Sequence, residues 1–436
     1  MINANKFFKY FFGYGVALFP LLLLVGPLIS EIFLILLIIF ATYSTITEKN
    51  YKYFNNKFFI FFLILYLIVL FSTLLNFHGF DNSKSAIFYL RIPIFAISVW
   101  YILDKLEILN KKILFFYIAF FLIIILDSLI QYYTGNNILG QEILRGRISS
   151  FFGEELILGG FIMRLIPIFL VYIIINGDFN EKKINYFYLA LISLSCLIVY
   201  LSGERTSFAL LILLFFTMYF VIKHLRKFII YTIILFTLLA IAISQVKISD
   251  DVDPAKRMFQ KSLAQITGKG QEQYEEYKKK IFNKVYIFSH DHHGHYVLSY
   301  KMFKDHPIIG TGVKGFRYLC RNKIYILEKN DGCSTHPHNT YVQILVSTGL
   351  IGFTILLIGF GYILKTIFVC RREISKTNVF DRYLVSQGII VSAIFVNLWP
   401  IVPSGNFFNN WLSMLYFYPI GFYLYLRFKN EKKKIS

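Results

Sequence analysis

The chain has 436 residues, of which 56% are hydrophobic and 19% aromatic, while only 16% are charged. A soluble domain carries about 25% charged residues, and a disordered one is poor in aromatic and aliphatic residues, so the composition excludes both classes. The net charge of +20 would suit a nucleic-acid-binding protein. Its lysines, however, lie in short clusters between long apolar runs, as in a membrane protein with basic loops on one side. We therefore expect no nucleic acid partner.

Long apolar runs recur along the whole chain. A helix needs about 20 apolar residues to cross a bilayer, so we expect an all-α polytopic membrane protein with about 12 transmembrane helices. The first run leads directly into the second without a small-residue cleavage site, so no cleavable signal is expected. The predicted spans are residues 8–26, 28–45, 58–76, 86–103, 112–132, 155–176, 185–201, 207–222, 228–245, 341–368, 382–402 and 409–427.

Lysines and arginines gather in alternate loops and at both termini, which predicts that both termini are cytoplasmic. The short loops on the other side hold only Lys84, Arg91, Arg145, Arg147 and Arg205. We expect an N-terminal bundle of about nine spans (1–245), one large exported loop domain between the ninth and tenth spans (246–340), and about three C-terminal spans with a basic cytoplasmic tail (341–436). Long loops are exempt from the charge bias, so the exported loop can be basic.

The exported loop begins with a polar part, residues 250–284, which is predicted as surface helix. Its second part holds Cys320 and Cys333, which can form a disulfide in an oxidising compartment, with two free thiols as the alternative. Cys196 lies within a span and Cys370 at a cytoplasmic end, so neither is expected to pair.

The same part of the loop contains a histidine-rich run, residues 289–295. Histidine and aspartate are good zinc ligands, but the run is short, contains glycine and lacks the spacing of a helical pair of ligands. We interpret it as solvated loop histidines without a metal. Among them, His295 is the one expected to face a site.

A polar turn at residues 202–206 separates two spans on the outer side. It is either a tight turn in which Glu204 and Arg205 neutralise each other, or a site where Arg205 binds a phosphate or pyrophosphate headgroup. A guanidinium offers a planar fork of donors suited to such anions, and a short turn needs no arginine. We favour the second interpretation, and Arg91 is a further candidate on this face.

A second basic site is the stretch with Arg145 and Arg147, which lies on the outer side, where few basic residues are expected. It precedes Glu154 and Glu155. The two arginines could hold an anionic headgroup or a sugar acid. Alternatively, the carboxylates only stabilise the start of the next helix, by about 0.3–1 kcal/mol. Arg164 lies inside that span, where it should pair with one of these carboxylates or line a wet cavity.

The strongest site is the junction of the loop domain and the tenth span. Thr340 and Gln343 have the spacing of a capping box, so a helix is expected to begin there. His338 would precede this helix, whose positive end disfavours imidazolium and keeps the ring neutral and able to accept a proton. Gly349 and Gly352 would let another helix approach closely. The alternative is that His338 is an ordinary loop histidine.

These motifs resemble the O-antigen ligase superfamily, which also contains O-antigen polymerases. The residues that carry the resemblance are His338–Asn339, followed by Gly349 and Gly352, the arginine of the 202–206 turn, the loop stretch 302–312 and the late stretch 403–408. The similarity covers roughly residues 140–425 in pattern, and the earlier spans match in topology only.

The resemblance implies a metal-independent, inverting glycosyltransferase of the bacterial inner membrane that needs no cofactor. The implied donor is a glycan on undecaprenyl pyrophosphate, and the implied acceptor is lipid A–core or a lipid-linked glycan. By position, His338 is the base that deprotonates the acceptor hydroxyl, on the periplasmic side. Arg205 is the pyrophosphate clamp that stabilises the leaving group.

The remaining site residues are predicted to contact substrate. Family members usually carry a second arginine ahead of the loop helix. His295 stands about there in this chain, and Arg317 and Arg321 are the nearest substitutes. His336 and Asn339 flank the predicted base and are expected to bind substrate too.

Two other functions remain open. A polymerase would use the same donor and the same motifs to extend a lipid-linked glycan. A transporter or lipid flippase would place its charges near the middle of the bilayer, but most charged residues here lie at the outer surface, with Arg164 as the exception.

Overall fold

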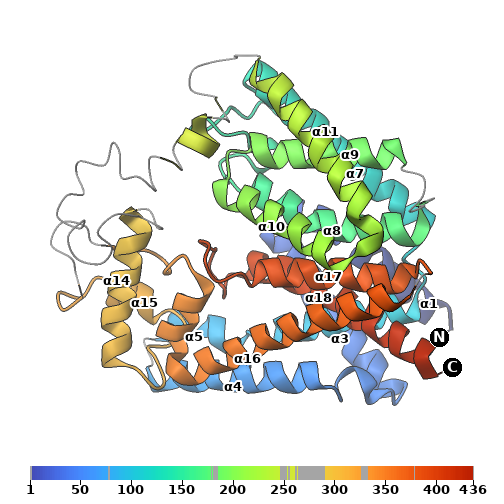
Figure 1. Ribbon diagram of the computed structural model, residues 1–436. Coiled ribbons are helices and arrows are strands. Elements are labelled where there is room, and N and C mark those ends of the chain that lie inside the picture. The colour runs from blue at the N-terminus through green and yellow to red at the C-terminus, as the bar shows by residue number, and fades with distance from the viewer. Residues whose placement is uncertain are drawn as a thin grey trace.

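The computed structural model describes residues 2–76, 79–177, 179, 185–245, 253, 256–260, 263, 290–325, 332–377 and 379–435. These residues form helices and, beyond two isolated β-bridges, no β-structure, in agreement with the predicted all-α class. Figure 1 shows a helical bundle with both termini at one end. We call the opposite end, where η4 and α14 lie, the distal end. The polar part of the loop predicted as surface helix falls almost entirely outside the described residues.

Every predicted apolar run coincides with a helix or a bent pair of helices. The first part of the chain forms α1 (Ile2–Ala17), α2 (Phe19–Val25), α3 (Pro27–Thr47), η1 (Tyr51–Tyr53), α4 (Lys57–Leu75), α5 (Phe80–Ile87), α6 (Arg91–Lys105), α7 (Lys111–Thr134), η2 (Ser150–Phe152), α8 (Leu158–Asn176), α9 (Tyr186–Leu201), α10 (Arg205–Val221), η3 (Lys223–Leu225) and α11 (Arg226–Ser244). The remainder forms η4 (Lys256–Gln260), α14 (His290–Asp305), α15 (Gly315–Leu319), α16 (Thr340–Lys376), α17 (Arg382–Asn397) and α18 (Asn410–Ile435).

Seven helices in the described part of the chain are long and apolar enough to cross a membrane, or eight if the bent pair α1 and α2 counts as one. These two helices meet at an angle of 68°. Three more apolar helices, α9, α10 and α17, are shorter. The count of twelve spans therefore stays a prediction, because several of the helices fall below the length that a full crossing needs.

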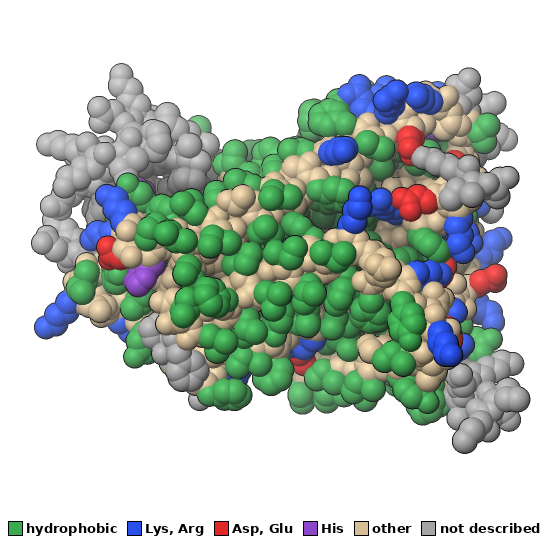
Figure 2. Space-filling model, turned by 90° about the horizontal axis from the view of Figure 1, so that it is seen from below, with side chains coloured by type: hydrophobic (Ala, Val, Ile, Leu, Met, Phe, Trp, Pro, Cys, Tyr) green, Lys and Arg blue, Asp and Glu red, His purple; other side chains and the backbone are tan. Residues whose placement is uncertain are grey.

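The core of the bundle lies around α8, which packs against α7, α9, α10 and α17. In its most apolar window 89% of the residues are buried, compared with 22% in α4 and α11. The outer helices expose apolar side chains instead. Figure 2 shows hydrophobic side chains over the middle of one face and most Lys and Arg side chains toward the end that holds the termini. This distribution is that of a protein with a lipid-facing belt.

The long helix α16 is broken at Gly349, whose φ of 62° and ψ of −161° are not helical. The break frees backbone groups that would be costly to leave unpaired. The loop 307–312 supplies their partners. The Thr311 N–H donates to the carbonyl of Val346 at 2.8 Å, and the N–H of Leu350 donates to the first carbonyl of the loop at 2.8 Å.

The predicted role of Gly349 and Gly352, to let another helix approach closely, is wrong. The groups closest to them belong to the inserted loop and to α16 itself. A Cβ atom at Gly349 would lie 2.2 Å from the carbonyl oxygen of Ile308, in the inserted loop. A Cβ atom at Gly352 would meet the side chain of Thr348 in its own helix. The glycine at 349 is therefore needed for the approach of a loop to a helix.

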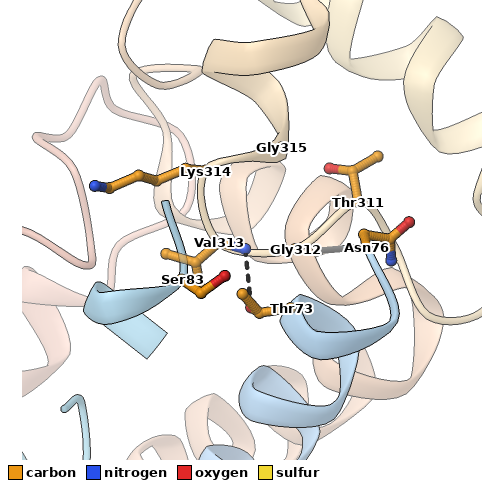
Figure 3. A pocket seen from close by; sticks show the side chains of 8 residues that line it. All are labelled: Thr73, Asn76, Ser83, Thr311, Gly312, Val313, Lys314 and Gly315. Carbon is orange, nitrogen blue, oxygen red and sulfur yellow. Dashed lines mark hydrogen bonds between the residues drawn. The ribbon is translucent and has the colours of Figure 1, made fainter. Parts of the chain in front are cut away.

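The next residues of the loop dock on the C-terminal end of α4. The backbone N–H of Val313 donates to Thr73 Oγ1 at 3.2 Å (Figure 3). Thr73, Asn76, Ser83 and Lys314 line a small polar pocket at this contact (Figure 3). Polar side chains in and just after an apolar helix thus hold the loop that fills the break in α16.

Replacing Gly349 by alanine should strongly destabilise the protein. The strained backbone alone costs about 1–3 kcal/mol in a residue other than glycine, and the new Cβ would also clash with the loop backbone. We expect a lower thermal unfolding midpoint and less detergent-extractable monomer. Gly361→Ala is the matched control, because a Cβ at this position of the same helix meets nothing within 4 Å. Equal unfolding midpoints for the two variants would contradict this account of the break.

Candidate active site

Four histidines meet where α14 packs against the segment that precedes α16. The ring centroid of His338 lies 4.0 Å from that of His336, 5.2 Å from that of His295 and 5.6 Å from that of His292. The histidine-rich run is therefore not a solvated loop, because it forms the first turns of α14. Helical spacing places His292 and His295 on one face, one turn apart. His292 was not among the predicted site residues.

Hydrogen bonds fix three of these rings. His295 Nδ1 donates to the carbonyl of Gly332 at 2.6 Å, which leaves Nε2 as the atom that can accept a proton. His338 Nε2 lies 3.1 Å from Ser334 Oγ, and His336 Nδ1 lies 2.9 Å from Thr335 Oγ1. A hydroxyl can donate or accept, so these contacts hold the rings without forcing them to be charged.

Both histidines of the segment 336–338 are neutral at pH 7. Burial lowers the pKa of His338 to about 3, and the other three histidines add to the effect. Burial also lowers the pKa of His336 to about 4, with contributions from His295, Arg317 and His292. The neutral state follows mainly from desolvation, and not from the helix terminus that the sequence indicated.

His338 has a left-handed backbone, with φ of 54°, directly before the N-cap of α16. The helix begins at Thr340 as predicted, but its cap is not the predicted capping box. Asn339 is the N-cap, and its Oδ1 accepts from the N–H groups of Tyr341 and Val342 at 2.9 and 3.1 Å. The side chain of Gln343 instead contacts the chain between α17 and α18.

A group of arginines surrounds the 202–206 turn, also at the distal end. Arg257 of η4 donates from Nε to Gly203 O at 3.0 Å and from Nη1 to Arg145 O at 3.3 Å. Arg147 donates to Ser202 O at 3.1 Å and to a further carbonyl in its own loop. Arg205, the exposed first residue of α10, lies close enough to lower the pKa of Arg257, after the larger effect of burial.

Glu204 differs from the alternative interpretation, a self-neutralising turn, because its hydrogen bonds join the turn to α8. It accepts from the N–H groups of Gly159 and Gly160 at 2.7 and 3.1 Å, and so binds the N-terminus of α8. It also accepts from Ser207 and lies 3.6 Å from Arg147. Burial raises the pKa of Glu204, and these donors oppose that shift. The carboxylate is therefore engaged in holding α8 and α10 together.

The other predicted arginines lie in separate places. Arg91 forms an ion pair with Glu31 at 2.6 Å. Arg164 does not show the expected pairing with Glu154 or Glu155, since it donates to Gly160 O at 2.8 Å and its guanidinium lies 5.0 Å from the ring centroid of Tyr416. A helix carbonyl and an aromatic face thus take the place of a carboxylate partner.

Two exposed arginines and a disulfide complete the histidine side of the site. Arg317 and Arg321 are exposed, and the charge of Arg317 acts on His336. Cys320 and Cys333 are joined by a disulfide, which ties the end of α15 to the segment before the site histidines. Cys196 and Cys370 are free and buried. Among the residues that the structure describes, no group of three or more His, Cys, Asp or Glu could hold a metal ion.

The structure thus defines a polytopic helical membrane protein with two polar clusters at its distal end. The histidine cluster comprises His292, His295, His336 and His338. The arginine cluster comprises Arg145, Arg147, Arg205 and Arg257. No contact joins them directly among the described residues. Arg257 could not have been assigned from sequence, because no local motif marks it. His292 belongs to the histidine-rich run, which was interpreted as a solvated loop.

A comparison with known families identifies the domain around the histidine cluster. Residues 295–357 match the family model described as O-antigen ligase. The match runs from His295 to beyond the break in α16 and includes the disulfide and His338. It confirms the predicted resemblance to the O-antigen ligase superfamily over these residues and supports a membrane enzyme of the ligase or polymerase type. No curated protein matches the chain.

Proposed function

We propose that the protein transfers a glycan from undecaprenyl pyrophosphate to a sugar hydroxyl of lipid A–core, on the periplasmic face of the bacterial inner membrane. In this proposal, the chain crosses the membrane about 12 times with both termini cytoplasmic, and residues 246–340 form the periplasmic domain. The observation that carries the proposal is the half-buried, neutral imidazole of His338, in a domain that matches the O-antigen ligase family and at the same end as four arginines.

The histidine cluster supplies the base. A neutral imidazole can accept the proton of the acceptor hydroxyl as the oxygen attacks the anomeric carbon of the donor. The bond from that carbon to the pyrophosphate oxygen breaks, and its electron pair leaves with undecaprenyl pyrophosphate. Attack opposite to the leaving group inverts the anomeric configuration. The reaction needs no redox cofactor and no metal ion in this scheme.

The arginine cluster supports the binding of a pyrophosphate. It gathers four guanidinium groups around one turn, and the carboxylate beside them, Glu204, is already engaged by α8 and α10. Burial and the neighbouring arginines lower the pKa of both Arg147 and Arg257, so the cluster gains stability when an anion binds. A diphosphate carries the opposite charge and the acceptor oxygens that guanidinium groups bind best. Arg205 is the exposed member that would contact it.

The proposal is tested by deleting the gene and examining surface polysaccharide on gels. We expect loss of capped lipopolysaccharide, while polymer linked to undecaprenyl pyrophosphate is retained. Complementation with the wild-type gene should restore the caps. Caps of a single repeat would overturn the assigned acceptor and indicate a polymerase. Unchanged lipopolysaccharide would overturn the proposed reaction.

A further inference from the structure

The chain between α17 and α18, residues 398–409, contacts most of the residues from His338 to Gln343. We call it the α17–α18 segment. The N–H of Ser404 donates to the backbone carbonyl of His338 at 2.9 Å. Asn339 Nδ2 donates to the carbonyls of Pro400 and Val402 at 2.8 and 3.2 Å. These bonds hold the backbone of His338 and the side chain of Asn339 against the α17–α18 segment.

The contacts continue into the first turn of α16. Thr340 Oγ1 lies 2.9 Å from Ser404 Oγ. Gln343 uses both ends of its amide, because Nε2 donates to Asn406 Oδ1 at 2.7 Å and Oε1 accepts from the N–H of Phe407 at 2.9 Å. Each partner lies more than 50 positions away in the sequence, so only the tertiary fold brings these hydrogen-bonding groups together.

The backbone of His338 needs such support. A left-handed conformation is unfavourable for a histidine and persists only where the surrounding structure determines it. The bond from Ser404 fixes the carbonyl of that residue. The two donors of Asn339 fix the next residue while its Oδ1 caps α16. The direction of the imidazole therefore depends on where the α17–α18 segment lies.

The far end of the same segment reaches the loop of the arginine cluster. Trp411, just beyond it, packs edge-on against Phe152 with ring centroids 6.3 Å apart. Phe152 belongs to η2, in the loop that also carries Arg145 and Arg147. Figure 1 shows α14, which carries two of the site histidines, at the distal end as well. The segment and the residue just beyond it therefore contact both the motif of His338 and the loop that carries Arg145 and Arg147.

We propose that the α17–α18 segment is a positioning element, and that Asn339 and Gln343 act as positioning residues that hold His338 against the substrate bound by the arginine cluster. Asn339 was predicted to bind substrate, but every polar atom of its side chain is engaged by the chain itself. This inference rests on the proposed function, since it assigns a role to residues that act through its base. It adds a part of the protein outside the matched family domain.

The test uses two variants that loosen the contact from opposite sides. Asn339→Ser keeps an N-cap side chain but removes both donors to the segment. Asn406→Ala removes the acceptor for Gln343 without touching α16. Thr354→Val is the control, because this exposed residue of α16 bonds only within its own helix. The assay uses purified full-length enzyme, lipid-linked glycan extracted from a deletion strain, and lipid A–core from the same strain.

We expect a fall of about 10-fold or more in kcat with little change in the KM for donor in both variants. The acid limb of the pH profile should also move upward by one unit or more. A loosened His338 becomes hydrated, and its pKa returns toward the ordinary value near 6.5. The groups that face the ring, His292 and His295 of α14, His336 and Arg317, stay in place, so they would not cancel this shift.

Wild-type kcat and pH profile in both variants would overturn the inference. So would a lower yield of enzyme whose remaining activity has the wild-type pH profile, because that result indicates a structural role alone. Asn406→Ala keeps the test decisive if Asn339→Ser fails to accumulate. A separate outcome, full activity of His338→Ala, would instead remove the base and with it the proposed function.

Discussion

Replacing His338 by alanine should lower kcat for glycan transfer by about 10²–10⁴-fold, the range for loss of a positioned general base. The protein should remain inserted and abundant, because the imidazole makes one side-chain hydrogen bond, to Ser334. His338→Asn is a second variant that tolerates the left-handed backbone and still lacks a base. His224→Ala is the control, since this histidine lies in η3, between α10 and α11 and away from the histidine cluster. Full activity of both His338 variants would remove the assignment.

The pH dependence of the wild-type enzyme follows from the same residue. Burial lowers the pKa of His338 to about 3, so the imidazole stays neutral as the pH falls from 7 toward that value. We expect kcat/KM to remain nearly constant between pH 7 and about 5, where an exposed imidazole would already be largely charged. The bound donor brings negative charge, which raises the pKa of the base toward the range in which it accepts a proton more effectively.

The membrane class and the position of the helices could be predicted because they depend on local composition. An apolar run forms a helix in a bilayer whatever its neighbours are, since every backbone group is then paired within the segment. The start of α16 at Thr340 was also predicted from local sequence, from the spacing of Thr340 and Gln343. Its cap was assigned to the wrong residue because the side chain of Gln343 hydrogen-bonds to Asn406, in the α17–α18 segment.

Features that depend on distant parts of the chain could not be predicted. The run around His292 contains glycine and resembles a loop, and its helix packs against the segment that holds Gly332. The break at Gly349 needs an inserted loop whose hydrogen bonds replace those of the helix. Arg257 reaches the 202–206 turn from η4, more than 50 residues along the chain. Spacing within a motif carries no information about such contacts.

The second large loss of activity is expected at Arg205, where even the conservative replacement by lysine should not be tolerated. Arg205→Lys keeps the charge but replaces a planar fork of donors with one ammonium group, which cannot hold two oxygens of a pyrophosphate in a fixed geometry. We expect kcat to fall by about 10²-fold, the order found when one donor to a developing negative charge is removed. The assay is transfer from extracted lipid-linked glycan to lipid A–core.

The neighbours of Arg205 determine how this result is interpreted. Arg147 and Arg257 donate to backbone carbonyls of the turn and its flanking loop, so they shape the cluster but have fewer donors left for a ligand. Arg226→Lys is the control, because Arg226, the first residue of α11, donates to the carbonyl of Tyr219 in α10 and lies outside the arginine cluster. Wild-type activity of Arg205→Lys would place the pyrophosphate elsewhere. Loss of activity in that variant alone would show that the exposed guanidinium, and not the total charge of the cluster, stabilises the leaving group.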